Sequence, residues 1–152
     1  MDTLSKSDLT NWVKKTASSL GFDLVKITYA KEFSEDKNRA LDRLNQGYMD
    51  GLPWYTASRV KRGTDPRQLL PGARSIICLG INYFQPTSDH RHGLDNNNTG
   101  RIANYAQGKD YHKLIKKRMR SFVAKMSSIL GKEFSAKWYV DDGPMLDRAA
   151  AN

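Results

Sequence analysis

Two adjacent residues with carboxyl groups, Asp141 and Asp142, are candidates for proton transfer. They follow residues 136–140, whose composition predicts a strand, and they precede Pro144, which suits the first turn of a helix. Ligands of open α/β folds gather at the carboxyl ends of strands. A carboxyl group there can donate or accept a proton when its surroundings adjust its pKa. The alternative is a helix N-cap, for which aspartate is among the best residues, and position alone favours the cap.

A second group of aromatic and ionisable residues, 104–112, opens the longest helix that the sequence predicts. The N-terminus of a helix attracts anions such as phosphate or carboxylate groups. Asp110 is expected to cap this helix. His112 could carry a proton or could simply be exposed, and a single histidine without further evidence favours exposure.

The polar side of the same helix carries basic residues at helical spacing, namely Lys113, Lys116, Lys117 and Arg120. The whole chain has 25 Lys and Arg residues against 16 Asp and Glu residues, which gives a formal charge of +9. Such a charge attracts polyanions, so nucleic acid is the expected partner. The alternative is a solvated basic face with no partner. Zinc-finger, RNA-recognition and P-loop motifs are absent from the sequence, so no standard nucleic-acid module is supported.

The chain contains one cysteine, Cys78, which excludes an internal disulfide, a cysteine zinc site and an iron–sulfur cluster held by these residues. Cys78 lies in an apolar run and is expected to be a small buried residue. His90 and His92 have no nearby partner for a metal and are expected at the surface. The first residues form no signal sequence, and no stretch could span a membrane, so we expect a cytoplasmic location.

Hydrophobic periodicity predicts an alternating framework of helices and strands around these residues. The first helix has apolar residues at helical spacing: Leu9, Trp12, Val13, Ala17 and Leu20. Ser5 and Asp8 resemble a capping box, and Gly21 suits the position after the helix. Residues 22–28 alternate as in a strand with one buried face. A short helix is predicted over residues 35–45.

Residues 47–72 are rich in Gly and Pro and predict a long ordered loop or a pair of short turns. Trp54 lies in this loop, whereas the other two tryptophans are expected in the core. Residues 74–83 are apolar enough to predict a central strand. Residues 85–100 predict a mobile surface loop.

The long helix is predicted over residues 110–130 and is stopped by Gly131. A strand over 136–140 and a helix from near Met145 follow. The expected fold class is α/β, with a mixed sheet flanked by helices. The chain stops inside the last predicted helix, so we expect residues 1–152 to be a single N-terminal domain of a larger protein.

The order of four sequence blocks resembles the N-terminal region of epoxyqueuosine reductases, which are cobalamin-dependent iron–sulfur proteins. The blocks are Leu20–Asp23, Asp65–Ile77 with Asn82 and Tyr83, Tyr105–Lys113, and Val140–Arg148. Members of this family reduce epoxyqueuosine to queuosine at the wobble position of tRNA. Cobalamin is the reactive cofactor, and two [4Fe–4S] clusters supply its electrons.

The resemblance implies roles for particular residues. Asp141 matches the carboxylic acid proposed as the proton donor, which reverses the preference for a cap. The implied cobalamin-binding residues are Tyr105, Gly108, Asp110, Tyr111, His112 and Arg148. The implied tRNA contacts are Arg101, Lys109, Lys113, Lys116 and Lys117. The expected partner is therefore tRNA, bound by a monomer.

The sequence also departs from the family pattern. Ala103 and Asn104 stand where the family usually has Ser-Arg, so a basic contact is lost or is taken over by Arg101. Asp147 stands where the family usually has Glu. The glycine-rich stretch and the cluster cysteines that normally follow are absent from these residues. We therefore expect the chain alone to be inactive. Two alternatives remain open: a non-enzymatic tRNA- or RNA-binding module, and a cobalamin-dependent reductase of a small molecule.

Overall fold

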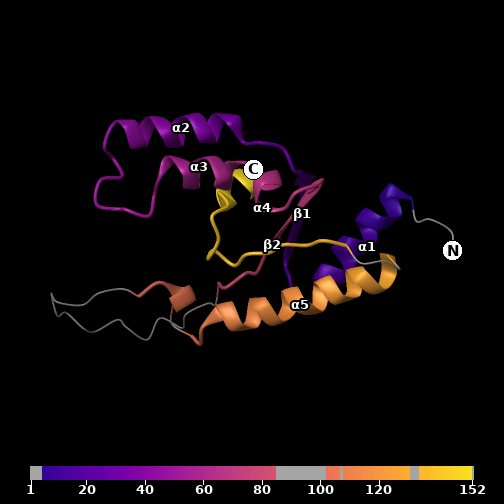
Figure 1. Cartoon of the computed structure of the whole chain (residues 1–152). Coiled ribbons are helices and arrows are strands. Elements are labelled where there is room, and N and C mark those ends of the chain that lie inside the picture. The colour runs from indigo at the N-terminus through magenta and orange to yellow at the C-terminus, as the bar shows by residue number, and fades with distance from the viewer. Residues whose placement is uncertain (1–4, 85–101, 107, 131–133, 152) are drawn as a thin grey trace, which may run out of the picture.

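The computed structural model contains an antiparallel pair of strands with helices arranged around it (Figure 1). The structure describes residues 5–84, 102–106, 108–130 and 134–151. Its elements are α1 (Lys6–Ser19), β1 (Leu24–Tyr29), α2 (Ser34–Asn45), α3 (Ala57–Thr64), α4 (Pro66–Leu69), β2 (Ser75–Gly80), the 3₁₀ turn η1 (Asn104–Ala106), α5 (Tyr111–Leu130) and α6 (Asp147–Ala151). The alternation of helices and strands confirms the predicted α/β class.

The sheet is antiparallel and two-stranded within the described residues, so the prediction of a mixed sheet was wrong there. Leu24 of β1 lies opposite Gly80 of β2, and Tyr29 lies opposite Ser75. The predicted strand over 136–140 has no regular secondary structure. Strand β2 and residues 134–141 line one cavity, and no backbone ladder joins them among the described residues.

Strand β2 is not central; its apolar residues partly cover both of its faces. Ile77 and Leu79 pack against the core formed by α1 and α5. Cys78 points the other way, and its Sγ donates to the carbonyl oxygen of Ala150 in α6 at 3.1 Å. The expectation that Cys78 would be buried was therefore only partly met, since it is half-buried.

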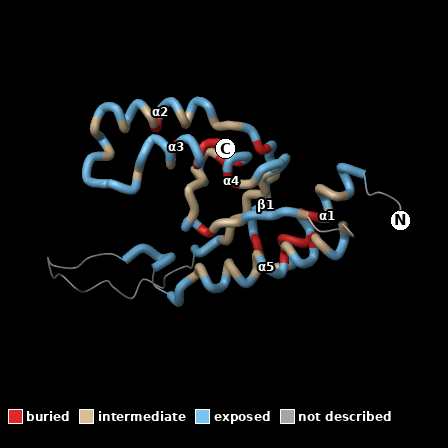
Figure 2. The backbone as a smooth tube through the Cα atoms, in the orientation of Figure 1, coloured by how far each residue is buried: buried red, intermediate tan, exposed pale blue. Residues whose placement is uncertain are grey.

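Helices α1 and α5 enclose the main hydrophobic core (Figure 2). The buried residues of this core are Val13, Ala17, Phe22, Phe122 and Met126. Ser5 caps α1, because its Oγ accepts a hydrogen bond from the backbone N–H of Asp8 at 3.1 Å. Gly21 follows the helix with a φ of +85°, which favours glycine. The predicted first and long helices, and this cap, are confirmed.

The prediction of loop or turns over residues 47–72 is confirmed for residues 47–56 and was wrong for residues 57–69, which contain two helices. Polar and proline residues begin both helices: Thr56 caps α3, and Asp65 caps α4 with Pro66 in the first turn. Thr64 at the end of α3 is fully buried, and its hydroxyl donates to the Val60 carbonyl at 2.9 Å. Figure 1 shows α2 and α3 side by side, away from α1 and α5.

Several expectations concern residues outside the described part of the chain. These are the surface positions of His90 and His92, the loop over 85–100, Arg101 and the helix stop at Gly131. Helix α6 begins at Asp147, two residues later than expected. In the described ranges no helix is long and apolar enough to cross a bilayer.

Candidate acid–base site

The N-terminus of α5 fixes the positions of Asp110, Tyr111 and His112. Asp110 is the predicted cap: its Oδ1 accepts a hydrogen bond from the backbone N–H of His112 at 3.0 Å. The first turn of a helix has free N–H groups, and an aspartate oxygen satisfies one of them. Capping therefore fixes the start of α5, and with it the direction of the next two side chains.

The imidazole of His112 lies between two carboxylates. Its Nδ1 is 2.8 Å from Oδ1 of Asp110, and its Nε2 is 2.8 Å from Oδ1 of Asp141. The His112 side chain is 35% exposed. In the protonated ring both nitrogens donate, so each carboxylate accepts one charge-assisted hydrogen bond. Simple exposure, which a single histidine had favoured, does not describe this residue.

Asp141 accepts from a second donor on the same helix, since the hydroxyl of Tyr111 hydrogen-bonds to its Oδ2. Both carboxylate oxygens of Asp141 are therefore engaged by α5. Asp141 is also the one non-glycine residue with a positive φ among the described residues, at +46°. Strained backbone of this kind concentrates at functional sites. The helix-cap alternative for Asp141 was wrong, because α6 begins six residues later, at Asp147.

These contacts shift pKa values in opposite directions. The hydrogen bond to Asp110 raises the pKa of His112; partial burial opposes this rise, and Asp141 adds to it. The hydrogen bonds from His112 lower the pKa of Asp110. The hydrogen bond to Asp141 raises the pKa of Tyr111 to about 12. His112 is therefore held toward its protonated form, and Tyr111 remains a neutral donor.

The neighbouring Asp142 is committed to a different partner. Its Oδ2 lies 2.6 Å from Nζ of Lys116, and its Oδ1 accepts from the backbone N–H of Val140 at 3.0 Å. The ion pair with Lys116 lowers the pKa of Asp142. Asp141 and Asp142 look equivalent in the sequence but have different partners. Asp141 contacts the titratable side chains of Tyr111 and His112, whereas Asp142 contacts the ammonium of Lys116.

Close packing against α3 holds the segment that carries both aspartates. The guanidinium Nη2 of Arg59 donates to the Gly143 carbonyl at 3.3 Å, and the backbone N–H of Leu146 donates to the Gly63 carbonyl at 3.1 Å. A side chain at Gly63 would overlap the carbonyl oxygen of Pro144. The turn-rich region thus supplies the support for the 141–144 segment.

A row of aromatic rings borders the site. Tyr83 and Tyr105 meet edge-to-face at 6.1 Å between centroids, and Tyr105 and Tyr111 do so at 6.2 Å. Tyr111 also stacks on His112 at 4.3 Å. Tyr83 and Tyr105 are 63% and 54% exposed, which is unusual for large aromatic side chains. The row therefore offers apolar surface to a flat ligand beside Asp141.

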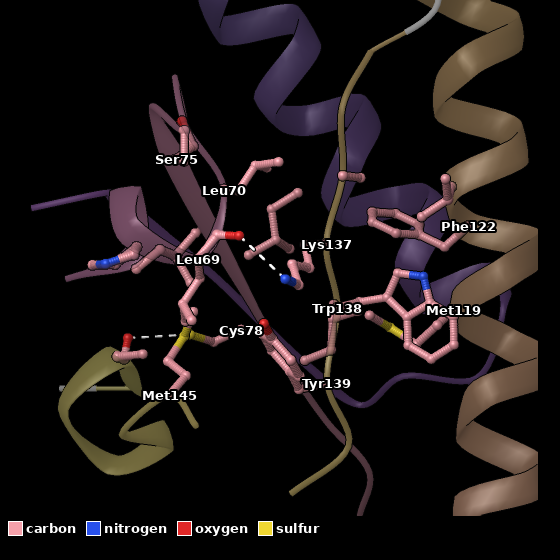
Figure 3. Close-up of a pocket in the computed structure, with 18 of the residues that line it drawn as sticks. Leu69, Leu70, Ser75, Cys78, Met119, Phe122, Lys137, Trp138, Tyr139 and Met145 are labelled. Atoms are coloured by element: carbon pink, nitrogen blue, oxygen red, sulfur yellow. Dashed lines mark hydrogen bonds between the residues drawn. The ribbon is translucent and has the colours of Figure 1, made fainter. Parts of the chain in front are cut away.

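Asp141 and Tyr111 also line a cavity of about 960 Å³. Figure 3 shows its lining: Cys78 on one side, Met119 and Phe122 of α5 on the other, and Trp138 between them. Lys137 reaches across it, and its Nζ donates to the Leu69 carbonyl at 3.3 Å. The acid–base group thus lies at the edge of a largely apolar cavity.

The structure brings together five of the predicted site residues: Tyr105, Asp110, Tyr111, His112 and Asp141. Gly108 and Lys109 are exposed in the preceding turn, and a side chain at Gly108 would meet open space. Arg148 lies exposed on α6 and makes no hydrogen bond or ion pair with other described residues.

Among the predicted basic residues, Lys113 and Lys117 are exposed, whereas Lys116 is paired. Sequence reasoning missed this pairing and also missed Arg59. Neither had a local signal, because the two residues of each contact lie far apart in the chain. In the described part of the chain, no group of three or more His, Cys, Asp or Glu residues could hold a metal ion.

Comparison with known proteins gives a consistent result. Residues 63–142, more than half of the chain, match the family described as "Epoxyqueuosine reductase QueG, DUF1730". An epoxyqueuosine reductase of Cyclobacterium marinum is 36% identical over 150 residues, which is 97% of this chain and 45% of that protein. The chain thus spans less than half the length of this curated relative.

Two solved structures have the same fold. A selenomethionine-labelled epoxyqueuosine reductase superposes with a TM-score of 0.80 and 26% identity, over 95% of this chain and 38% of that one. An epoxyqueuosine reductase solved with an epoxyqueuosine-modified tRNA-Tyr stem loop superposes with a TM-score of 0.75 and 24% identity, over 95% and 37% of the two chains. This chain belongs to the epoxyqueuosine reductase QueG family.

Proposed function

We propose that this chain is the part of an epoxyqueuosine reductase that delivers a proton to the epoxide of a tRNA-borne substrate, and that Asp141 is the donor. The observation that carries the proposal is the pair of hydrogen bonds from Tyr111 and His112 to the two oxygens of Asp141. Family membership supports the reaction class, and a related reductase was solved with a modified tRNA stem loop. We also propose that residues 1–152 act as one N-terminal domain of the enzyme.

The reaction needs an acid because the epoxide oxygen leaves as water. Converting an epoxide to an alkene breaks two C–O bonds and consumes two electrons and two protons. A carboxylic acid beside the epoxide oxygen can protonate it as its C–O bond breaks. The carboxylate that remains must then regain a proton within the same turnover, because the oxygen takes up two protons before it leaves as water.

His112 is placed to return that proton. Its Nε2 faces Oδ1 of Asp141 at 2.8 Å, and Asp110 holds the opposite nitrogen. Because Asp110 raises the pKa of His112, the imidazolium persists to higher pH than that of an ordinary histidine. Tyr111, which remains neutral, orients the other oxygen of Asp141. We assign His112 and Tyr111 as positioning residues.

The aromatic row fits cobalamin, because the corrin ring is large and flat and the exposed Tyr83 and Tyr105 present apolar faces beside Asp141. Tyr105, Tyr111 and the open turn at Gly108 would hold its edge, and Arg148 would contact its polar substituents. Cobalamin, when bound, would supply electrons to the substrate. The [4Fe–4S] clusters would be held by a part of the enzyme outside this chain, since one cysteine cannot ligate them.

The tRNA would contact the exposed lysines of this region. Lys109, Lys113 and Lys117 are exposed near the start of α5, beside the proposed donor. Phosphate contacts by such residues supply most of the affinity for a nucleic acid and depend on salt. Arg101 is proposed as a further contact from the sequence resemblance alone.

The decisive experiment compares Asp141→Asn with Asp142→Asn in the full-length, cobalamin-loaded protein. Asp142 is an adjacent carboxylate whose partner is Lys116, so it controls for loss of charge. We expect Asp141→Asn to slow queuosine formation about a hundredfold or more and to leave tRNA binding intact. Asp142→Asn should slow it less than tenfold. Near-normal turnover by Asp141→Asn would refute its role.

The same assay separates the two other functions. A binding module would bind tRNA in a salt-dependent manner, with or without cobalamin, and would form no queuosine in the unsubstituted protein. A reductase of a small molecule would turn over its substrate and show no affinity for tRNA.

A further inference from the structure

We propose that Trp54 is a stacking platform for an unpaired base of the RNA substrate, and that Arg62 binds a phosphate of the same strand. This inference rests on the proposed function, because it assumes an RNA substrate. It adds a recognition surface on α3 and the loop before it, separate from the α5 lysines.

Trp54 is exposed yet held in one orientation. Its side chain is 55% exposed. The guanidinium of Arg59 lies over its ring at 4.9 Å from the centroid, and Tyr55 meets it edge-on at 5.6 Å. A large apolar ring that is fixed in place but left open to solvent can bind a flat partner with little loss of side-chain entropy. A nucleobase is such a partner, because every base offers a π-face.

Arg59 joins this ring to the proposed proton donor's segment. The same guanidinium that covers Trp54 donates to the Gly143 carbonyl at 3.3 Å. Gly143 follows Asp141 by two residues. Trp54 is therefore separated from the segment of the donor by a single arginine side chain, so a base stacked there would belong to the nucleotides near the reacting one.

A small basic pocket borders the same segment at Pro144. It has a volume of about 250 Å³ and is lined by Arg62, Gln68, Leu69, Lys137, Tyr139 and Pro144. Two of these side chains are cationic and none is acidic. The pocket is large enough for a phosphate group, and its chemistry suits one.

Charge on α3 agrees with an RNA partner. The helix carries Arg59, Lys61 and Arg62 and no acidic residue. A positive helix preceded by a loop with an exposed tryptophan combines the two features of single-strand binding, cations that contact phosphates and a ring that stacks on bases.

The test measures binding of the full-length protein to a synthetic anticodon stem-loop RNA and to a fully paired RNA duplex of equal length. Trp54→Ala should weaken stem-loop binding about tenfold, with an unchanged dependence on salt, because stacking releases no counterions. It should leave duplex binding unchanged, since paired bases are not available. Trp54→Phe should restore most of the affinity.

Arg62→Ala should behave differently and lower the slope of log Kd against log salt by about 0.7 to 0.9. Tyr29→Ala is the matched control. Tyr29 is also an exposed aromatic residue, at 74%, and Nζ of Lys31 lies 5.5 Å from its ring centroid. Unlike Trp54, it lies at the end of β1, opposite Ser75. The Tyr29→Ala variant should bind both RNAs normally.

The outcomes distinguish this inference from the proposed function. If the unsubstituted protein forms queuosine and binds the stem loop, but Trp54→Ala binds it equally well, the stacking platform is wrong and the proposed function stands. If Trp54→Ala weakens duplex and stem-loop binding alike, its effect is general and the platform is also wrong. If the unsubstituted protein binds neither RNA, both proposals fail.

Discussion

His112 on α5 and Asp141, 29 residues later, meet with Nε2 and Oδ1 2.8 Å apart, while Asp110 holds the other ring nitrogen at 2.8 Å. A histidine with a carboxylate on each nitrogen is stabilised as the imidazolium. Its raised pKa means that this stabilisation is fully present below the usual value of about 6.5 and is lost as pH rises through the higher value of the folded protein.

We therefore predict that the pKa of His112, measured by NMR titration, lies above that of an ordinary histidine. Asp110→Asn should lower this pKa more than Asp141→Asn, because the hydrogen bond to Asp110 is the larger cause of the rise. The chain has three histidines, so the other two resonances provide internal references. An equal effect of the two variants would contradict the dominance of Asp110.

The titration of His112 should also affect the rate of turnover. The rate of a single turnover should fall as pH rises through the raised pKa of His112, since Asp141 then loses its source of protons. His112→Gln should be slower and should lack this limb of the pH profile. If His112→Gln is slower but its rate still falls over the same pH range, another group is responsible for the pH dependence.

A second prediction concerns Tyr111, whose pKa is raised to about 12 by its hydrogen bond to Asp141. Asp141→Asn should return this pKa toward 10, because the carboxylate that disfavours a phenolate is gone. Titration of the tyrosine ring carbons by NMR measures the change, and Tyr111→Phe identifies the resonance among seven tyrosines. An unchanged pKa in Asp141→Asn would place its cause elsewhere.

The sequence predicted the helices of this fold better than the relations between them. Apolar periodicity located α1 and α5, and the cap by Asp110 followed from its position. Local patterns carry such features because each depends on residues a few positions apart. The turn-rich stretch misled because Thr56, Asp65 and Pro66 favour helix starts as much as loops.

The site shows the same division. The sequence identified Asp141 and His112 individually, but their position favoured a cap and an exposed ring. The family resemblance favoured Asp141 as the proton donor. Neither the residue pattern nor the resemblance predicted that the side chains of Asp141 and His112 meet. The pairing of Lys116 with Asp142 and the bond from Arg59 to Gly143 were also hidden, because they join segments 26 and 84 residues apart. Side-chain contacts at such separations depend on the packing of the whole chain.

A third prediction concerns the packing of α3 against the 141–144 segment. Gly63→Ala would force a side chain into the Pro144 carbonyl and should destabilise the chain by about 1–3 kcal/mol, as overpacking does. Thermal unfolding should show a Tm lowered by roughly 2–10 °C. Gly108→Ala is the control, because its side chain would meet open space. A Tm equal to that of Gly108→Ala would mean that the two segments separate easily.

The last prediction distinguishes among the basic residues of α5. Lys113 and Lys117 are exposed, whereas the ammonium of Lys116 is 2.6 Å from Asp142. An ammonium already paired with a carboxylate releases few counterions when a phosphate approaches. Lys113→Ala with Lys117→Ala should therefore lower the salt slope of tRNA binding by about 1.5, at 0.7 to 0.9 for each phosphate contact.

Lys116→Ala combined with Asp142→Ala removes one charge of each sign and should leave the slope unchanged. The measurement is the affinity for tRNA across a series of salt concentrations in the full-length protein. The salt slope of the Lys116→Ala/Asp142→Ala variant could instead fall as far as that of the Lys113→Ala/Lys117→Ala variant. That result would show that Lys116 leaves Asp142 to bind the RNA. The ion pair would then be a resting contact that the substrate replaces, and Asp142 would become free beside Asp141 when tRNA binds.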